Sequence, residues 1–395
     1  MHVTFLADKL NISRGGSNFS LDLMARTLSE RGHEVTIVTV NFGHENDLPS
    51  NPPYSIREDP VNSRTRVGSA KSVYRTLRDV RIESDIIHIF NPALLPVAGY
   101  FKKRNRESIL VGRLNSYDVF CTNHAIMTEE CPSNCTVRKK YVHDNDSSPL
   151  NVPKYSFDTF ALPGLLNQFD RLLALSPTVQ HIYESIGVDS EVFTQIPNFY
   201  DPSFAEGDIE PIRQGDGFSI LYVGALREHK GVDILIRAAD QLDDDIHISI
   251  IGDGEQKDDL IELSKRLEVT EAVSFLGRID NQRLPGYYAG SDVFVHPGRW
   301  PEPFNRTLLE AMQCRCPIVA SNIGAPPTII ESCGLTFERN DPISLAKVIT
   351  RLISNPKLLR KFEENSQKRI KQYDPDRIIS QLENTYLELE GQDGT

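Results

Sequence analysis

The sequence predicts an α/β protein built from two doubly wound, Rossmann-like domains. Three observations support this fold class: short apolar strands alternate with helix-length segments, the alternation occurs in two series, and a stretch rich in Pro, Gly, Asp and Glu separates the series. A chain of 395 residues has room for two domains of ordinary size. Hydrophobic residues make up 39% of the chain, which excludes a disordered protein.

The first series begins with a βαβ unit at the N-terminus. An apolar run at 3–7 is followed by a Gly15-Gly16 turn, by apolar residues at helical spacing, and by a β-branched run at 34–40. Helix-length segments separate the further strands that we expect, which are 86–90, 109–114 and 171–175. Such spacing is what an open parallel sheet requires.

The second series repeats this organisation. Its helix is expected at 232–242, and its strands at 219–223, 246–251, 273–276, 293–296 and 318–320. We therefore expect a first domain at 1–198, a linker at 199–217, a second domain at 218–374, and an amphipathic helix at 375–390 that packs back on the first domain. Ligands of doubly wound sheets bind beyond the carboxyl ends of the strands, so two such domains facing each other would leave a cleft for a ligand.

Charge and hydropathy exclude several classes of protein. The formal net charge of −12 argues against general attraction to nucleic acid. No segment has the roughly 20 apolar residues that a membrane-spanning helix needs, and the N-terminus lacks the features of a signal peptide. We therefore expect a cytoplasmic protein whose six cysteines are reduced thiols or metal ligands.

The sharpest local pattern lies at 301–312, where Glu302 stands in a Pro-bounded loop and Glu310 inside the helix that follows. A helix that begins near Asn305 would direct its free N–H groups and the positive end of its dipole toward a phosphate or a sugar oxygen. Carboxylates beside such a site can accept hydrogen bonds from sugar hydroxyls. The alternative is that both glutamates are ordinary solvated charges, since this spacing is common.

Other strand ends of the second series carry compatible residues. Gly224 and the turn Gly252-Asp253-Gly254 end neighbouring strands, and Lys230 stands near a helix start, where it can neutralise a diphosphate. A lone lysine would otherwise be expected to face solvent.

Taken together, these residues resemble the family-four glycosyltransferases of the GT-B fold, over nearly the whole chain. The resemblance rests on seven elements in the family's order: Gly15-Gly16, Arg31-Gly32-His33-Glu34-Val35, Ile196-Pro197-Asn198, Lys230-Gly231, Gly252-Asp253-Gly254, Phe275-Leu276-Gly277, and Glu302 through Leu309-Glu310-Ala311-Met312. It implies two Rossmann-like domains facing across a cleft, with the acceptor on the first domain and the nucleotide-sugar donor on the second.

The resemblance also implies an activity, which is transfer of a sugar from a nucleoside-diphosphate sugar to a glycan or lipid-linked acceptor with retention at the anomeric carbon. Glu302, Lys230 and Asn115 become the candidate catalytic residues. The implied donor-binding residues are Gly15, Gly16, Arg227, Lys230, Gly252, Asp253, Arg278, Glu302, Phe304, Asn305, Thr307 and Glu310. Of these, Glu310 would hold the ribose, and Arg278 would lie near the base. Glu302 and the backbone of Phe304 and Asn305 would hold the sugar hydroxyls. Lys230 and the amides after Gly15 would face the diphosphate.

Three positions depart from the family's pattern. Ala225 replaces an arginine that would contact phosphate, although Arg227 stands two residues further on. Asn305 replaces a glycine. Asn115 replaces a histidine and cannot act as a base, but it can still donate a hydrogen bond to a sugar hydroxyl. These departures leave open a catalytically silent sugar-nucleotide-binding protein, and an epimerase or phosphorylase of the same fold is a further alternative.

Four potential metal ligands follow Asn115 within a short segment: Cys121, His124, Cys131 and Cys135. They are enough for tetrahedral zinc, although their spacing is not that of a standard zinc knuckle. The alternatives are a buried thiol cluster or an adventitious disulfide formed after purification. Asp243-Asp244-Asp245 precedes a strand instead of following one, so we expect no metal cofactor for catalysis and, at most, a structural zinc.

Basic residues gather in the near-neutral first domain. The eleven that we considered are Arg57, Arg64, Arg66, Lys71, Arg75, Arg78, Arg81, Lys102, Lys103, Arg104 and Arg106. On one surface they would attract anionic lipid headgroups, which would place the protein at the inner face of the plasma membrane, in the biosynthesis of cell-surface polysaccharides or glycoprotein glycans. Interleaved acidic residues leave a solvated mixed-charge face as the alternative.

Overall fold

The computed structural model describes residues 1–393 except 12–15, 41–47, 62–65, 122–130, 132–133, 144–150 and 243–244. The described residues form two compact units. The first contains the chain up to Asn198 together with the segment from Pro375 onward, and the second contains Phe199–Asp374. Gly15, His124, Asp243 and Asp244 lie outside the described residues.

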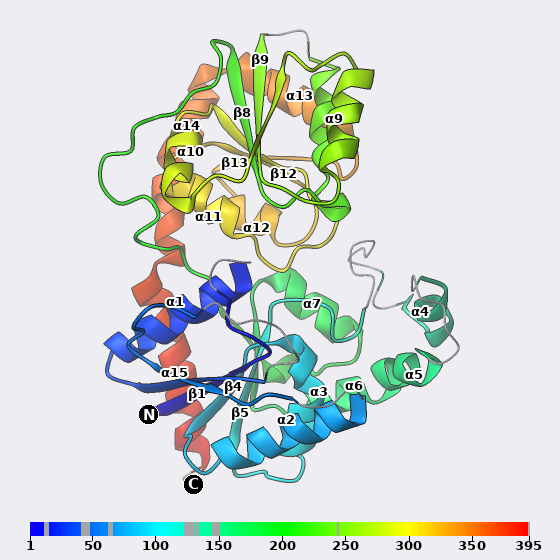
Figure 1. Ribbon diagram of the computed structural model, residues 1–395, viewed down its shortest axis with the longest axis vertical. Coiled ribbons are helices and arrows are strands. Elements are labelled where there is room, and N and C mark those ends of the chain that lie inside the picture. Colours follow the sequence, from blue (N-terminus) through cyan, green and yellow to red (C-terminus); the bar gives the residue numbers. More distant parts are fainter. Residues whose placement is uncertain are drawn as a thin grey trace. The chain divides into compact units, whose positions relative to one another are not determined.

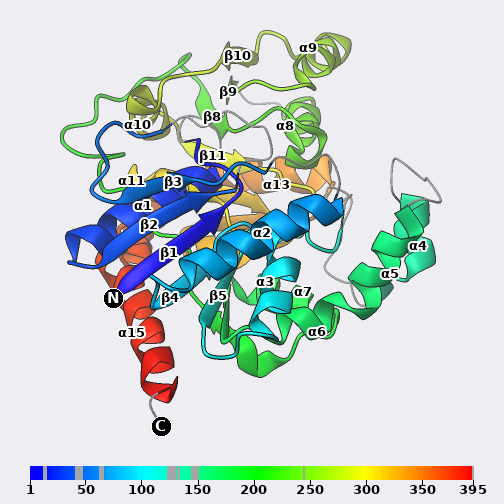
Figure 2. The same ribbon diagram turned by 60° about the horizontal axis from the view of Figure 1, so that its bottom comes forward.

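The first unit contains a parallel sheet of seven described strands in the order β3-β2-β1-β4-β5-β6-β7. The strands are β1 (His2–Ala7), β2 (Glu34–Thr39), β3 (Ser55–Glu58), β4 (Ile86–Ile89), β5 (Ile109–Leu114), β6 (Arg171–Ala174) and β7 (Phe193–Gln195). The helices are α1 (Gly16–Glu30), α2 (Arg66–Val80), α3 (Leu95–Lys102), α4 (Val137–His143), α5 (Val152–Phe160), α6 (Leu162–Leu166), α7 (Pro177–Ser185) and α15 (Pro375–Asp393). Figures 1 and 2 show this arrangement.

Helix α15 returns the end of the chain to the first unit. Its Tyr386 hydroxyl lies 2.6 Å from Nδ1 of His88 in β4, and Arg31 after α1 forms ion pairs with Asp376 and Glu383 at 2.8 and 2.5 Å. Because Tyr386 is fully buried, this helix is part of the core of the first unit.

The opposite face of the first sheet carries α3. Gly112 in β5 has no side chain, and a Cβ placed there would lie only 2.8 Å from the side chain of Leu95 in α3. The helix therefore packs directly on the strand. Beside it, α2 and α6 each contact α3, and Figure 2 shows α2 and α3 next to each other.

The second unit contains a parallel sheet of six described strands in the order β10-β9-β8-β11-β12-β13. The strands are β8 (Phe218–Val223), β9 (Ile246–Ile251), β10 (Val273–Gly277), β11 (Val293–His296), β12 (Ile318–Ser321) and β13 (Gly334–Phe337). The helices are α8 (Val232–Ala239), α9 (Lys257–Arg266), α10 (Leu284–Ala289), α11 (Arg306–Gln313), α12 (Pro326–Ile330), α13 (Pro342–Ile353) and α14 (Pro356–Arg369). The strands are almost wholly apolar because helices cover both of their faces.

The segment 199–217 differs from the linker that its composition predicts, because it packs onto the second unit. Phe204 is 7% exposed and its ring lies 6.0 Å from that of Tyr288 in α10. The N–H of Ile212 donates to the carbonyl of Gly286 at 2.8 Å, and Arg213 pairs with Asp292 at 2.7 Å. Tertiary contacts therefore order a segment that has no secondary-structure period of its own.

Among the described helices, none is both long enough and apolar enough to cross a membrane.

Candidate functional site

Each sheet has one point at which the strand order reverses. In the second sheet this point lies between β8 and β11, and in the first sheet it lies between β1 and β4. Loops that leave neighbouring strands at such a point diverge to opposite faces, so they open a crevice at the carboxyl ends of the strands. Lys230 follows β8 and Glu302 follows β11, so both predicted residues belong to the crevice of the second sheet.

Glu302 is the centre of a buried polar cluster. Its Oε1 accepts from the ammonium of Lys230, and its Oε2 lies 2.9 Å from Nε2 of His296 and 3.1 Å from Nδ2 of Asn305. Glu302 is only 7% exposed, and Asn305 is equally buried. The cluster therefore joins the turn after β8 to the loop after β11, two segments that are 72 residues apart in the chain.

The pKa of Glu302 reflects a competition between burial and charge. Burial by itself would raise the pKa of this carboxyl, but Lys230 and His296 outweigh burial and hold the pKa well below its usual range. Glu302 is therefore a carboxylate at neutral pH and can act only as a hydrogen-bond acceptor.

Helix α11 begins directly behind this cluster. The Oδ1 atom of Asn305 accepts from the N–H of Thr307 at 2.9 Å and from its hydroxyl at 2.6 Å, so Asn305 caps the helix. Phe304 is 9% exposed and its ring lies 5.9 Å from that of Tyr373. Because capping and the bond to Glu302 occupy the Asn305 side chain, its contribution to a ligand is confined to its backbone.

Glu310 lies one turn into the same helix. It accepts from the hydroxyl of Tyr288 at 3.0 Å. Burial raises the pKa of Glu310 above its usual value, although Arg306 and Tyr288 act in the opposite direction. Burial makes the ionised form of Glu310 unfavourable, so a ligand that donates hydrogen bonds to this carboxylate would stabilise it.

Two glycines bring the strand ends of this crevice close together. Gly252 after β9 has a φ of +141°, and a Cβ there would lie 1.8 Å from the carbonyl oxygen of Gly224 after β8. Gly231 has a φ of +66°, and a Cβ there would lie 2.1 Å from the carbonyl oxygen of Pro297 after β11. Any side chain at Gly231 would push the turn that carries Lys230 away from Glu302.

Three further predicted residues lie at the exposed edge of this crevice. Arg278, after β10, approaches Asp253 to 3.7 Å, with 78% of the arginine side chain exposed. Arg227 is exposed, and within the described residues its guanidinium has no hydrogen-bond or ion-pair partner. A free cation two residues after Ala225 is consistent with the predicted replacement of the family's arginine.

The first unit has a polar pocket at its own point of reversal. It has a volume of about 200 Å³ and is lined by residues that follow β1, β4 and β5, among them Asp8, Lys9, Asn91, Asn115 and Asp118. Both amide hydrogens of Asn115 are engaged, since Nδ2 lies 3.0 Å from the hydroxyl of Ser17 and 3.0 Å from the carbonyl of Phe90. The expectation that Asn115 donates to a sugar hydroxyl stays a prediction, and this arrangement leaves its carbonyl oxygen as an acceptor.

Comparison with known proteins agrees with this geometry. The sequence profile of the family Glycosyltransferase Family 4 matches residues 14–204, and that of Glycosyl transferases group 1 matches residues 208–369. Together the two profiles span both units. The chain is a family-four glycosyltransferase.

Curated relatives of this glycosyltransferase share modest identity with it. An uncharacterized glycosyltransferase of Methanocaldococcus jannaschii is 33% identical over 178 residues, which are 44% of this chain and 45% of that protein. The N-acetyl-alpha-D-glucosaminyl L-malate synthase of Bacillus anthracis is 23% identical over 401 residues, which cover 95% of each chain. The match thus spans about half the length of the first relative and nearly all of the second.

Solved structures show that the glycosyltransferase has the GT-B fold. HepE of Anabaena, solved in complex with UDP, superposes with a TM-score of 0.76 at 20% identity and covers 98% of this chain and 100% of its own. Sucrose-phosphate synthase from Thermosynechococcus elongatus superposes with a TM-score of 0.75 at 18% identity and covers 99% and 100%. This confirms the prediction of two Rossmann-like domains.

Some residues of the glycosyltransferase's site escaped the sequence analysis. His296 was predicted only as the end of a strand, and Tyr288 was not singled out at all. Both lie in apolar stretches, where neither periodicity nor spacing distinguishes a core residue from a partner of a carboxylate. Gly16 begins α1, whereas Gly15 lies outside the described residues, so the predicted contact of its following amides with phosphate stays a prediction.

The cysteine segment of the glycosyltransferase is described only in part. Cys121, Cys131 and Cys135 are thiols that form no disulfide, and the side chains of Cys131 and Cys135 are hydrogen-bonded to each other. No group of three or more His, Cys, Asp or Glu residues within the described part of the chain could hold a metal ion. Since His124 lies outside that part, the zinc site stays a prediction.

Proposed function

We propose that this protein transfers a hexosyl group from a nucleoside-diphosphate sugar to a glycan or lipid-linked acceptor, with retention of the anomeric configuration. The observation that carries the proposal is the buried cluster of Lys230, Glu302 and His296 at the point of strand reversal in the second sheet. Such a position combines a cation, an ionised carboxylate and a helix N-terminus, which are the groups that a sugar diphosphate needs.

The donor would use each charged group for a different part of its structure. Lys230 has three N–H donors, so it can keep its bond to Glu302 and still donate to a phosphate oxygen. Glu302 would accept hydrogen bonds from sugar hydroxyls, and Glu310 would accept them from the ribose. Arg227 and the amides that begin α11 would add positive potential near the diphosphate. HepE, which shares this fold, has also been solved in complex with UDP-glucose.

The chemical step would place new negative charge on the leaving diphosphate. The bond between the anomeric carbon and the diphosphate oxygen breaks, its electron pair stays on that oxygen, and the acceptor oxygen forms the new bond on the same face of the sugar. The diphosphate oxygen takes the acceptor's proton, so no protein base is required and Asn115 is no obstacle. Lys230 stabilises the charge as it develops, and therefore lowers the barrier instead of merely tightening binding.

The first unit would bind the acceptor. In the pocket around Asn115, the carbonyl oxygen of Asn115 and the carboxylates of Asp8 and Asp118 are acceptors for hydroxyl groups, whereas Lys9 is a donor. This mixture suits a polyhydroxylated acceptor such as a glycan.

We also propose that the acceptor is met at an anionic membrane face. Of the predicted basic residues, Lys71, Arg75, Lys103, Arg104 and Arg106 are exposed and form no ion pair within the described part of the chain. Others are unavailable: Lys102 is 7% exposed and pairs with Asp170 at 2.7 Å, which corrects its assignment to a basic surface. Arg57 and Arg81 pair with Asp59 and Glu107, each at 2.7 Å. Arg64 and the side chain of Arg66 lie outside the described part.

Donor binding and turnover test the central proposal separately. A panel of UDP, GDP, ADP and their sugars is screened by thermal shift, since a ligand of the folded state alone raises Tm. The donor that binds is then used in a sugar-transfer assay with a pool of glycan and lipid-linked acceptors. Lys230→Ala and Glu302→Gln are each expected to lower kcat about 10²- to 10³-fold. The matched controls are Lys265→Ala and Glu262→Gln on the exposed side of α9, which are expected to keep wild-type rates.

The outcomes separate the alternatives. Wild-type rates in both site variants would refute the assignment of the site. Saturable nucleotide binding with no turnover on any acceptor would instead indicate a silent sugar-nucleotide-binding protein. A requirement for phosphate would indicate a phosphorylase, and formation of a new sugar from the donor alone would indicate an epimerase.

A further inference from the structure

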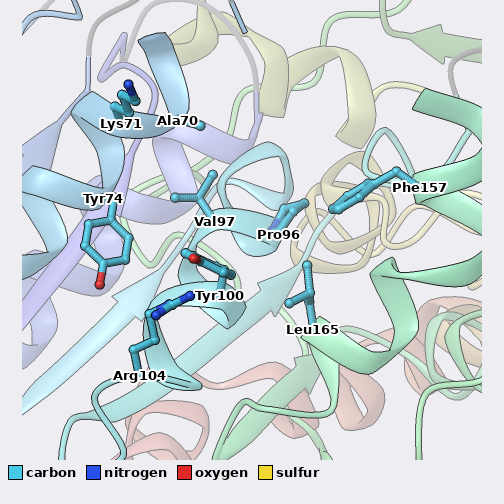
Figure 3. A pocket seen from close by; sticks show the side chains of 9 residues that line it. All are labelled: Ala70, Lys71, Tyr74, Pro96, Val97, Tyr100, Arg104, Phe157 and Leu165. Carbon is cyan, nitrogen blue, oxygen red and sulfur yellow. The ribbon is translucent and has the colours of Figure 1, made fainter. Parts of the chain in front are cut away.

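The first unit has a second pocket, which is larger than the one around Asn115 and differs from it in character. Its volume is about 580 Å³, and its walls are made by Tyr74 of α2, Val97 and Tyr100 of α3, Phe157 of α5, and Leu165 of α6, with a few further residues. Figure 3 shows these side chains around the pocket. A volume of this size is in the range of small-molecule sites.

The pocket offers very few hydrogen-bonding groups, which decides against a sugar or a nucleotide as its occupant. Most of its lining is hydrocarbon or aromatic ring. Tyr100 and Phe157 nevertheless remain 44% and 40% exposed, and Phe160, one turn further along α5, is 78% exposed. Large apolar side chains that gather in this way at the surface of a water-soluble unit mark a binding surface for apolar groups.

Positive charge lies beside the apolar walls. Lys71 and Arg104 also line the pocket, and Figure 3 shows them on either side of Tyr74, Val97 and Tyr100. The guanidinium carbon of Arg104 lies 4.6 Å from the centre of the Tyr100 ring. Neither cation forms an ion pair within the described residues, so both are available to an anionic group. An occupant that matches this lining has a hydrocarbon chain and a negatively charged head.

One segment of the chain lines both pockets of the first unit. Asn91 and Pro92 line the polar pocket around Asn115, and Pro96 and Val97 line the apolar pocket. Pro92 and Pro96 are four helical residues apart, which corresponds to about 6–8 Å along the segment. The two pockets are therefore separated by one short stretch of their shared wall.

We propose that the apolar pocket binds the hydrocarbon chain of a lipid-linked acceptor whose anionic group lies against Arg104, with Lys71 adding positive potential on the other side of the pocket. This inference rests on the proposed function, since it names the class of acceptor that the first unit would present to the donor. The occupant is one amphiphile withdrawn from its surroundings, with its hydrocarbon chain in the pocket and its anionic group beside Arg104.

Binding of dodecyl phosphate, measured by calorimetry below its critical micelle concentration, tests the proposal without turnover. Wild-type protein is expected to bind dodecyl phosphate saturably. It is expected to bind inorganic phosphate, which lacks the chain, and dodecyl maltoside, which lacks the charge, at least tenfold more weakly. Equal binding of dodecyl maltoside would refute the role of the cations, and equal binding of inorganic phosphate would refute the role of the pocket.

Four variants locate the site. Val97→Glu places a charge in the pocket wall and is expected to weaken dodecyl phosphate binding at least tenfold. Phe157→Ser is expected to act in the same direction, and its 40% exposure makes it the safer variant for folding. Arg104→Glu is expected to weaken binding at least fivefold, since each basic residue near an anionic head contributes about that factor. Lys103→Glu makes the same charge change one residue away, outside the pocket lining, and is expected to bind as wild type does.

Two results would overturn the proposal. The first is that Val97→Glu and Phe157→Ser both bind dodecyl phosphate as the wild type does. The second is that Lys103→Glu and Arg104→Glu lose the same amount of affinity, which would indicate unspecific electrostatic attraction. The nucleotide thermal shift, measured in the same proteins, separates this inference from the proposed function. Pocket variants are expected to leave that shift unchanged. A normal nucleotide shift without dodecyl phosphate binding would refute the lipid pocket alone, whereas the reverse pattern would refute the proposed function.

Discussion

Replacement of Lys230 by methionine is expected to destabilise the second unit. The substitution keeps most of the side chain's length but leaves the Glu302 carboxylate, which is 7% exposed, without its ammonium partner. Loss of one partner of a buried ion pair costs about 3–5 kcal/mol. Since the Lys230 side chain keeps 20% exposure and His296 still contacts Glu302 at 2.9 Å, we expect a loss near or below the lower end of that range, about 2–3 kcal/mol.

The intrinsic fluorescence of Trp300 can be used to measure this loss of stability. Trp300 is the single tryptophan of the chain, it is 8% exposed, and it lies two residues before Glu302. Its fluorescence during urea unfolding therefore follows the second unit. The predicted loss corresponds to a fall in Tm of about 5–10 °C for a unit of this size.

A double variant tests whether the buried charge is the cause. Lys230→Met with Glu302→Gln removes both charges, and it is expected to be more stable than the sum of the two single losses predicts, by about 1–2 kcal/mol. The matched control is Arg237→Met, which breaks a surface pair with Asp233 at 3.8 Å in the same unit. It is expected to change stability by less than about 0.5 kcal/mol. Additive losses in the double variant, or a Lys230→Met protein as stable as wild type, would refute the reasoning.

Three further predictions concern titration and metal. Folding lowers the pKa of Glu302, so its contribution to stability is present above pH about 4.3 and is lost as the pH falls toward the folded pKa. In Glu302→Gln, the urea concentration at the unfolding midpoint should therefore change less between about pH 5 and 3 than it does in the wild type. The same pH dependence in both proteins would contradict this prediction. Because the pKa of Glu310 is raised by burial, its ionised form opposes folding at neutral pH, and stability is regained as the pH falls through the folded pKa. Glu310→Gln should therefore raise Tm by about 2–4 °C at pH 7 while weakening nucleotide binding, and a lower Tm would count against it. Metal analysis of protein purified without added metal should find about one zinc per chain, with less in Cys135→Ser, and metal-free wild-type protein would end the zinc prediction.

The central strands could be predicted from the sequence, whereas three of the four described edge strands could not. The runs at 86–90, 109–114 and 293–296 are apolar because both faces of a central strand are covered, and each differs from the observed strand by at most one residue. β3 (Ser55–Glu58), β7 (Phe193–Gln195) and β13 (Gly334–Phe337) were not predicted. They are short and partly exposed edge strands, so pairing with a neighbour determines them more than their own pattern does.

The candidate site could likewise be predicted only in part from the sequence. Residue type and order within the motifs were enough to predict that Lys230, Glu302 and Glu310 belong to one site. They could not reveal that Lys230 binds Glu302 itself, because that contact depends on the reversal of strand order between β8 and β11. Likewise, no local pattern indicates that Lys102 bends back to the carbonyls of Arg106 and Ser108, at 2.8 and 2.6 Å.

The return of α15 to the first unit has a consequence for synthesis on the ribosome. Ile379, Leu382 and Tyr386 are fully buried in that unit, yet they leave the exit tunnel after the whole of the second unit. All of Phe199–Asp374 is translated before them. The first unit therefore completes its core only after the second unit has been translated, and until α15 emerges the face of β4 that it covers stays open to a chaperone.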